Sequence, residues 1–225
     1  MPPPPPRQLR FDLGRAPPLA RDDFVVSPAN LEAVRMLDAW PEWRAGCLTL
    51  VGPEACGKTH LATIWAAETG AVRAGSAPLS ELRGRPVLLE GAERGVDDET
   101  LFHLIEMAAE PGGGLLMTSR LLPLAWSCDL PDLRSRLNAL PVAQIDAPDD
   151  MVLEGVLRRF FEARHITPAE ELYPYLLARM ERSVPRAWEL VAMLDDAALE
   201  RGQAVSRALA RQILEIDGET PDLFP

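Results

Sequence analysis

Residues 52–60 read GPEACGKTH, and this stretch decides what kind of fold the chain can adopt. It contains the pattern G-x-x-x-x-G-K-T, which places backbone N–H groups and a helix start around a phosphate. Before it stands the apolar run CLTLV at 47–51, which predicts a buried strand. After it, THLATIWAAET at 59–69 predicts a helix that Gly70 ends. A strand, a glycine loop and a helix in this order predict a nucleotide-binding loop.

The loop offers a cation and a hydroxyl in the positions that phosphate and metal require. Lys58 neutralises the outer phosphates and the Thr59 hydroxyl ligates Mg²⁺, so we expect ADP or ATP as the ligand, with Mg²⁺ as a further candidate. Lys58 is also the only lysine among 23 basic residues, although arginine-rich codon usage explains the scarcity of lysine elsewhere. The expected nucleotide contacts in the loop are Gly52, Pro53, Glu54, Ala55, Cys56, Gly57, Lys58, Thr59 and His60.

Composition narrows the function classes. The formal net charge is -11 over 225 residues, which disfavours binding to a phosphate backbone and hence direct sequence-specific DNA binding. Three cysteines without paired or metal-type spacing, and an opening MPPPPPR that cannot form a secretory signal, predict a cytoplasmic protein. No apolar run approaches the length that spans a bilayer, so we expect no membrane association.

The chain divides into four parts. We expect a disordered arm over 1–21, an α/β base over 22–148, an all-α lid over 149–217 and a tail over 218–225. Strands interleaved with helices predict a parallel sheet with helices on both faces. Within the base we expect a helix over 27–40 capped by Ser27, a helix over 97–110, and strands at 47–51, 71–74, 87–90, 115–118 and 142–145.

Several segments resemble the AAA+ family, and within it the group formed by the replication initiator DnaA and its shorter regulatory relative Hda. The resemblance covers residues 22–215, and the DNA-binding domain of DnaA has no counterpart in it. It implies an AAA+ fold, with a parallel sheet and a helical lid. The segments that carry it are FVVSPAN (24–30), GKTHL (57–61), MTSR (117–120), LPDLRSRL (130–137) and VPRAWELV (184–191).

The resemblance also implies roles for single residues. Phe24 would line the adenine pocket, and Thr118 and Ser119 would stand at the family's sensor 1. Arg186 falls at sensor 2, where it would contact the bound phosphates; the alternative is a salt bridge to Glu189 on the same helix.

Arg136 occupies the arginine-finger position of the family's box VII, which reaches the γ-phosphate of a neighbouring subunit. A surface ion pair is the alternative for Arg136. Arg134 is the rival for the finger and points elsewhere on a helix.

The sequence departs from the family at VLLEGAE, residues 87–93. The family ends this strand in an aspartate that orients Mg²⁺ and a second residue that positions the attacking water. Glu90 takes the first place, one methylene longer, and Gly91 takes the second without a side chain. Glu93 is a weak candidate to replace it. We therefore expect little or no intrinsic ATPase activity and a nucleotide, ADP above all, that serves structure.

The arm carries a second signal, QLRFDL at 8–13. It resembles the short peptide with which bacterial proteins dock on the replicative sliding clamp. Gln8 would bind the rim of the clamp pocket, and Leu9, Phe11 and Leu13 would anchor in it. The alternative is that this stretch docks on the protein's own sheet.

Together these features predict a regulator that docks on the DNA-loaded clamp and supplies Arg136 to DnaA, so that DnaA-bound ATP is hydrolysed and over-initiation of replication is prevented. Two other classes stay open: an autonomous AAA+ ATPase of the helicase-loader type, and a clamp-binding accessory with a non-functional nucleotide site. A homodimer is also left open.

Overall fold

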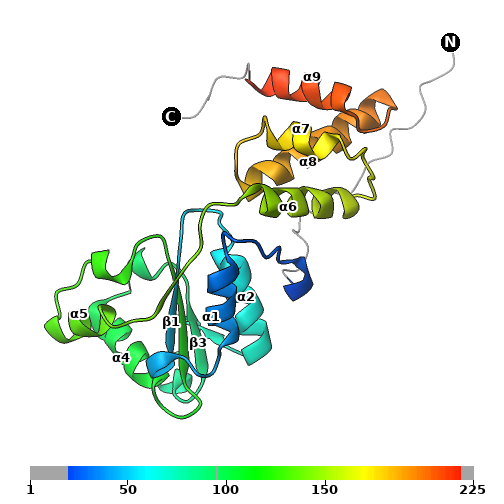
Figure 1. Ribbon diagram of the computed structural model, residues 1–225. Coiled ribbons are helices and arrows are strands. Elements are labelled where there is room, and N and C mark those ends of the chain that lie inside the picture. The colour runs from blue at the N-terminus through cyan, green and yellow to red at the C-terminus, as the bar shows by residue number, and fades with distance from the viewer. Residues whose placement is uncertain (1–19, 95, 219–225) are drawn as a thin grey trace.

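The computed structural model describes residues 20–94 and 96–218. Within them lies a five-stranded sheet of order β2-β3-β4-β1-β5, in which every neighbouring pair is parallel. Parallel neighbours need a crossover, and helices supply it here (Figure 1). The strands are β1 (Cys47–Val51), β2 (Val72–Arg73), β3 (Pro86–Leu89), β4 (Gly114–Ser119) and β5 (Val142–Gln144).

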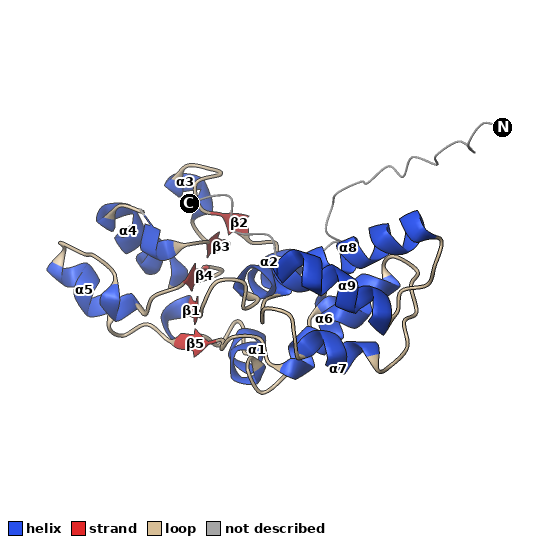
Figure 2. Ribbon diagram, turned by 90° about the horizontal axis from the view of Figure 1, so that it is seen from above, coloured by secondary structure: helices blue, strands red, loops and turns tan. Residues whose placement is uncertain are grey.

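Helices cover both faces of this sheet, as predicted (Figure 2). One face packs on α1 (Leu31–Asp38) and α2 (Lys58–Thr69), and the other on α4 (Asp98–Ala108) and α5 (Pro131–Leu137). Side chains alternate between the faces along each strand, so Leu48 joins the core beneath α1 and α2 and Cys47 joins the other. The short helix α3 (Leu79–Leu82) precedes β3.

The first helix starts later than predicted. Ser27 does not cap it; its hydroxyl instead accepts a hydrogen bond from the N–H of Ala29 at 3.1 Å. The Asn30 side chain accepts one from the N–H of Ser27 at 2.9 Å, which closes a turn, and α1 begins at Leu31. These two short polar side chains bond to nearby backbone N–H groups in a turn, and the turn takes the place of the first helical turn.

After the sheet the chain forms a separate helical bundle with its own core. Its helices are α6 (Asp150–Glu162), α7 (Leu172–Leu177), α8 (Val184–Arg201) and α9 (Arg207–Gly218). Leu157, Phe161 and Leu190 are fully buried at its centre. The Asp149 side chain caps α6 by accepting a hydrogen bond from the N–H of Val152 at 2.9 Å.

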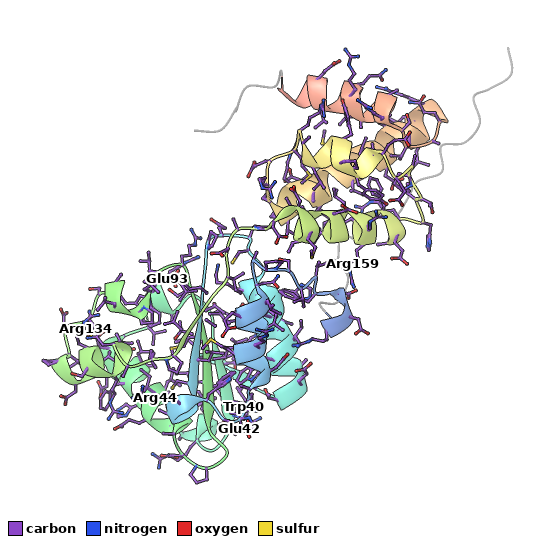
Figure 3. All side chains as sticks on the ribbon, in the orientation of Figure 1. Trp40, Glu42, Arg44, Glu93, Arg134 and Arg159 are labelled. Atoms are coloured by element: carbon purple, nitrogen blue, oxygen red, sulfur yellow. The ribbon has the colours of Figure 1, made fainter. Side chains whose placement is uncertain are left out.

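The bundle meets the base through the segment that leads into α1. Arg159 on α6 forms an ion pair with Asp23 in the 3-10 helix Arg21–Asp23, toward which it projects in Figure 3. Close by, a Cβ added to Gly155 would lie 2.7 Å from Val25, so glycine permits the close approach of α6. The segment around residues 21–25 therefore fixes where the bundle sits.

The predicted clamp peptide, with Gln8, Leu9, Phe11 and Leu13, lies outside the described residues. Among the helices that the structure does describe, none is both long and apolar enough to cross a membrane.

Candidate nucleotide site

The glycine loop connects β1 to α2 and depends on two glycines. A Cβ at Gly52 would lie 2.3 Å from the carbonyl oxygen of Ile145 and 2.7 Å from the sulfur of Cys56, so no side chain fits there. Gly57 adopts a left-handed φ of 103° directly before α2. The loop thus packs tightly against Ile145, the residue after β5, and against Cys56, and then turns into the start of α2. Cys56 itself is buried and fills space within the turn.

The ammonium group of Lys58 lies inside the curve of this loop. Its Nζ donates to the carbonyl oxygens of Gly52 at 2.8 Å and Pro53 at 2.5 Å. These contacts hold the cation over the loop, where a phosphate would meet it together with the N–H groups at the start of α2. Thr59 is exposed one residue further along, so its hydroxyl is open to a metal or phosphate. The residues present fit a nucleotide phosphate chain.

Phe24 and His60 form an aromatic wall beside the loop. Their rings meet edge to face, with centroids 5.2 Å apart, and a Cβ at Gly57 would lie 3.2 Å from the Phe24 ring. Burial lowers the pKa of His60, with Arg159 adding to the effect and Ala20 and Asp23 opposing it. The imidazole is therefore neutral at neutral pH and can donate from Nε2 to the carbonyl of Ala20 at 3.2 Å. Phe24 therefore lies next to the loop, and its role in lining an adenine pocket stays a prediction.

Thr118 and Ser119 end β4 and point to opposite faces of the sheet. Thr118 lies two residues after Leu116, which packs on the α2 side, so the two share that face of the sheet, and the Thr118 hydroxyl accepts a hydrogen bond from the N–H of Gly91 at 3.0 Å. The Ser119 hydroxyl accepts one from Trp126 Nε1 at 3.1 Å on the other side. Thr118 is therefore the member of the pair that faces the α2 side, while Ser119 holds the chain that leads to α5.

Glu90 forms an ion pair with Arg73, which stands on the neighbouring strand β2. Its side chain is 32% exposed. Sequence reasoning missed Arg73, because only the pairing of β2 with β3 brings these positions together. In the described part of the chain no group of three or more histidine, cysteine or acidic residues could hold a metal ion. The carboxylate of Glu90 is thus neutralised by a guanidinium group beside the strand end.

Glu93 is a buried carboxylate and holds the end of β4 (Figure 3). Its side chain is 8% exposed, and Oε1 accepts a hydrogen bond from the N–H of Arg120 at 3.2 Å. Burial alone would raise its pKa, but this bond, its own backbone, the Ser119 hydroxyl and the charge of Arg94 outweigh burial and lower the pKa. Glu93 contacts the end of β4 on the face of the sheet where Ser119 lies. This position favours a structural role for Glu93 and disfavours the role of replacing the side chain missing at Gly91.

The lowered pKa of Glu93 predicts a pH dependence of stability. A carboxyl with a folded pKa below its usual 4.5 stabilises the fold above that value, and this contribution is lost as pH falls through the folded pKa. We expect Glu93→Gln to lower the thermal midpoint at pH 7, and the gap to the parent protein to close under acidic conditions. Calorimetry from pH 7 down to acidic pH measures the difference in thermal midpoint between the two proteins. A gap that stays constant with pH would contradict the assignment.

Arg134 and Arg136 on α5 have different partners. The guanidinium group of Arg134 donates to the backbone carbonyls of Leu124 at 3.1 Å and Trp126 at 2.6 Å, and so holds the loop before α5. Arg136 is 41% exposed and pairs with Glu106 at 3.0 Å. The surface ion pair considered as its alternative role is thus present, while Arg134 is occupied by its own loop. The proximity of α4 to Arg136 could not be predicted from the residue pattern.

Arg186 lies in the first turn of α8, where Ser183 caps the helix by accepting a hydrogen bond from the Arg186 N–H at 3.2 Å. Its side chain is 17% exposed and donates to Glu189 at 3.2 Å. The salt bridge weighed for this residue is therefore formed. Arg186 belongs to the bundle, whereas the loop 52–59 belongs to the base, so any joint contact with phosphate depends on how the bundle closes over the base.

A parallel sheet of this order, a glycine loop between β1 and α2, and a following helical bundle define the AAA+ fold. Comparison with solved structures agrees. The chain superposes on domain III of the Thermotoga maritima initiator DnaA with a TM-score of 0.72 and 19% identity, over 92% of this chain and 99% of that one. AMPPCP-bound DnaA from Aquifex aeolicus gives 0.65 and 14%, over 82% and 67%.

The same fold extends to the branch-migration motor RuvB. A Thermotoga maritima RuvB variant gives a TM-score of 0.66 at 17% identity, over 88% of this chain and 72% of that one. No protein family model and no curated protein sequence matches the chain. The likeness to DnaA and RuvB establishes the AAA+ fold.

Proposed function

We propose that this protein is an Hda-like, nucleotide-binding regulator that promotes hydrolysis of DnaA-bound ATP. One observation carries the proposal. Position 91 has no side chain to activate water and Glu90 is paired with Arg73, while the guanidinium group of Arg136 lies exposed on the surface of α5. The molecule is equipped to hold a nucleotide and to present a cation to another molecule's nucleotide.

Its own nucleotide serves the fold. ADP or ATP is held by Lys58, with Phe24 and His60 beside the adenine ring and Thr59 available to Mg²⁺. Bound Mg²⁺ would supply charge neutralisation for the phosphates. Because a ligand that binds only the folded state stabilises it, the nucleotide stabilises the packing of the helical bundle on the α/β part of the chain. Two of the solved AAA+ relatives, both DnaA, carry AMPPCP.

The arm and Arg136 then act together. The peptide at 8–13 docks on the sliding clamp, and Arg136 enters the ATP site of DnaA, where it stabilises charge that develops on the γ-phosphate. A short peptide and one arginine bind weakly apart, but linkage on one clamp raises their effective concentration. The net charge of -11 accords with a clamp-mediated rather than direct contact with DNA.

The proposal is tested by measuring ATP hydrolysis of DnaA with this protein, with and without clamp loaded on DNA. We expect strong stimulation only when protein and loaded clamp are both present, and very slow hydrolysis by this protein alone. Unchanged DnaA hydrolysis refutes the regulatory role. Rapid hydrolysis by the isolated protein would instead support an autonomous ATPase.

A further inference from the structure

We propose that Phe102 and Glu106 on α4 position the guanidinium group of Arg136 for entry into the partner's nucleotide site. This inference rests on the proposed function and deepens it. The two residues stand four apart, so they lie one above the other on the same side of the helix. Arg136 reaches them from α5, which packs against α4.

The contacts fix both the plane and the direction of the guanidinium group. Its central carbon lies 4.5 Å from the centroid of the Phe102 ring, within the range of a cation–π contact. Its Nη2 donates to Glu106 Oε1 at 3.0 Å. Phe102 is itself partly buried and packed against the core under α4, so the ring is a fixed platform. Two side chains of α4 therefore hold one exposed cation of α5.

This arrangement leaves donors of Arg136 available to a phosphate. A guanidinium group carries five N–H donors, and the bond to Glu106 uses Nη2. A free arginine side chain would lose much of its rotamer freedom on reaching a phosphate. Stacking on Phe102 removes part of that loss before the partner arrives, and orientation of this kind contributes directly to rate.

Arg134 provides a contrast on the same helix. It donates to three backbone carbonyls of the loop before α5, those of Pro123, Leu124 and Trp126. These contacts are typical of an arginine that stabilises the local backbone. Arg136 instead contacts two side chains of α4, the ring of Phe102 and the carboxylate of Glu106, which also lies 3.7 Å from His103 Nδ1. The two helix positions are built for different tasks.

The test uses Phe102→Leu and Glu106→Gln in the full-length protein, assayed by stimulation of DnaA ATP hydrolysis on clamp-loaded DNA. For each, we expect the maximal stimulated rate to fall about 10- to 100-fold, as for a misplaced reacting group. The concentration that gives half-maximal stimulation should stay unchanged. Phe102→Tyr keeps the aromatic face and should restore the rate. Glu110→Gln is the matched control, because Glu110 accepts from Arg83 at 3.3 Å in a comparable surface pair.

The outcomes separate this inference from the proposed function. Loss of stimulation in Arg136→Ala with parental rates in both α4 variants overturns the positioning role but keeps the regulator. Parental stimulation by Arg136→Ala removes the arginine-finger assignment as well, whereas the regulatory role itself falls only if the parent protein fails to stimulate DnaA hydrolysis. A higher rate in Glu106→Gln overturns the inference too, because the carboxylate would then restrain the arginine. Glu106 is 44% exposed, so Glu106→Gln should fold normally even if Phe102→Leu is destabilised.

Discussion

Arg136→Ala should lower the stimulated rate of DnaA ATP hydrolysis by about 10³-fold or more, which is the scale of arginine fingers in other NTPases. The positive charge stabilises the transition state, so its removal should lower the maximal stimulated rate and leave the binding affinity unchanged. The fold should be unaffected, because Arg136 forms a surface pair with Glu106 whose loss costs at most about 1 kcal/mol. A steady-state phosphate-release assay with DnaA and DNA-loaded clamp measures the effect.

Two controls accompany this variant. Arg83→Ala removes another exposed arginine that pairs with a glutamate, and it should stimulate like the parent protein. Binding of Arg136→Ala to the clamp should equal that of the parent, since the peptide at 8–13 is unchanged. Stimulation within a factor of two of the parent value would show that Arg136 does not enter the partner's site.

Lys58→Ala should weaken nucleotide binding about 10- to 100-fold, because a hydrogen bond to a charged group contributes about 1.5 to 3 kcal/mol. Nucleotide stabilises only the folded protein, so the rise in thermal midpoint on adding ADP should shrink accordingly. Without ligand, Lys58 donates to the carbonyls of Gly52 and Pro53, and the variant loses those bonds too. Calorimetric titration with ADP measures the affinity directly.

Lys58→Arg sharpens this experiment. A planar guanidinium group is larger than an ammonium group and does not fit the same curve of the loop, so it should not restore binding. The chain uses arginine at its other 22 basic positions, which makes the lysine at 58 informative. Arg85→Ala, which removes an exposed cation ahead of β3, should bind ADP normally. An undiminished ADP shift in Lys58→Ala would place the nucleotide elsewhere.

Much of the fold could be predicted because its signals are local. The run 47–51 matches β1 to the residue, since four apolar residues and one threonine between two glycines suit a buried parallel strand. Gly70 ends α2 in the left-handed conformation, as expected. The predicted start of α1 was wrong, because the Asn30 side chain accepts from the N–H of Ser27 and the Ser27 hydroxyl accepts from the N–H of Ala29, and no periodicity records these turn bonds.

The site could be predicted only in part. The pattern around Lys58 carries its own geometry, so the loop was clear from the sequence. The partners of single charges were not, because Arg73 reaches Glu90 through strand pairing and Phe102 reaches Arg136 through helix packing. Such contacts join residues 17 to 34 positions apart, and neither spacing nor residue type indicates them. The sequence does not indicate which residues become neighbours in the folded protein.

The segment around residues 20–25 contacts two parts of the molecule at once. Ala20 and Phe24 meet His60 beside the loop, while Asp23 pairs with Arg159 and Val25 packs on Gly155 in the bundle. Thermodynamic linkage is reciprocal, so if a bound ligand tightens the docking of α6 through this segment, docked α6 tightens ligand binding by the same factor. Residues 20–25 therefore connect the nucleotide loop to the helical bundle. We expect the order of this segment to depend on whether nucleotide is bound to the loop.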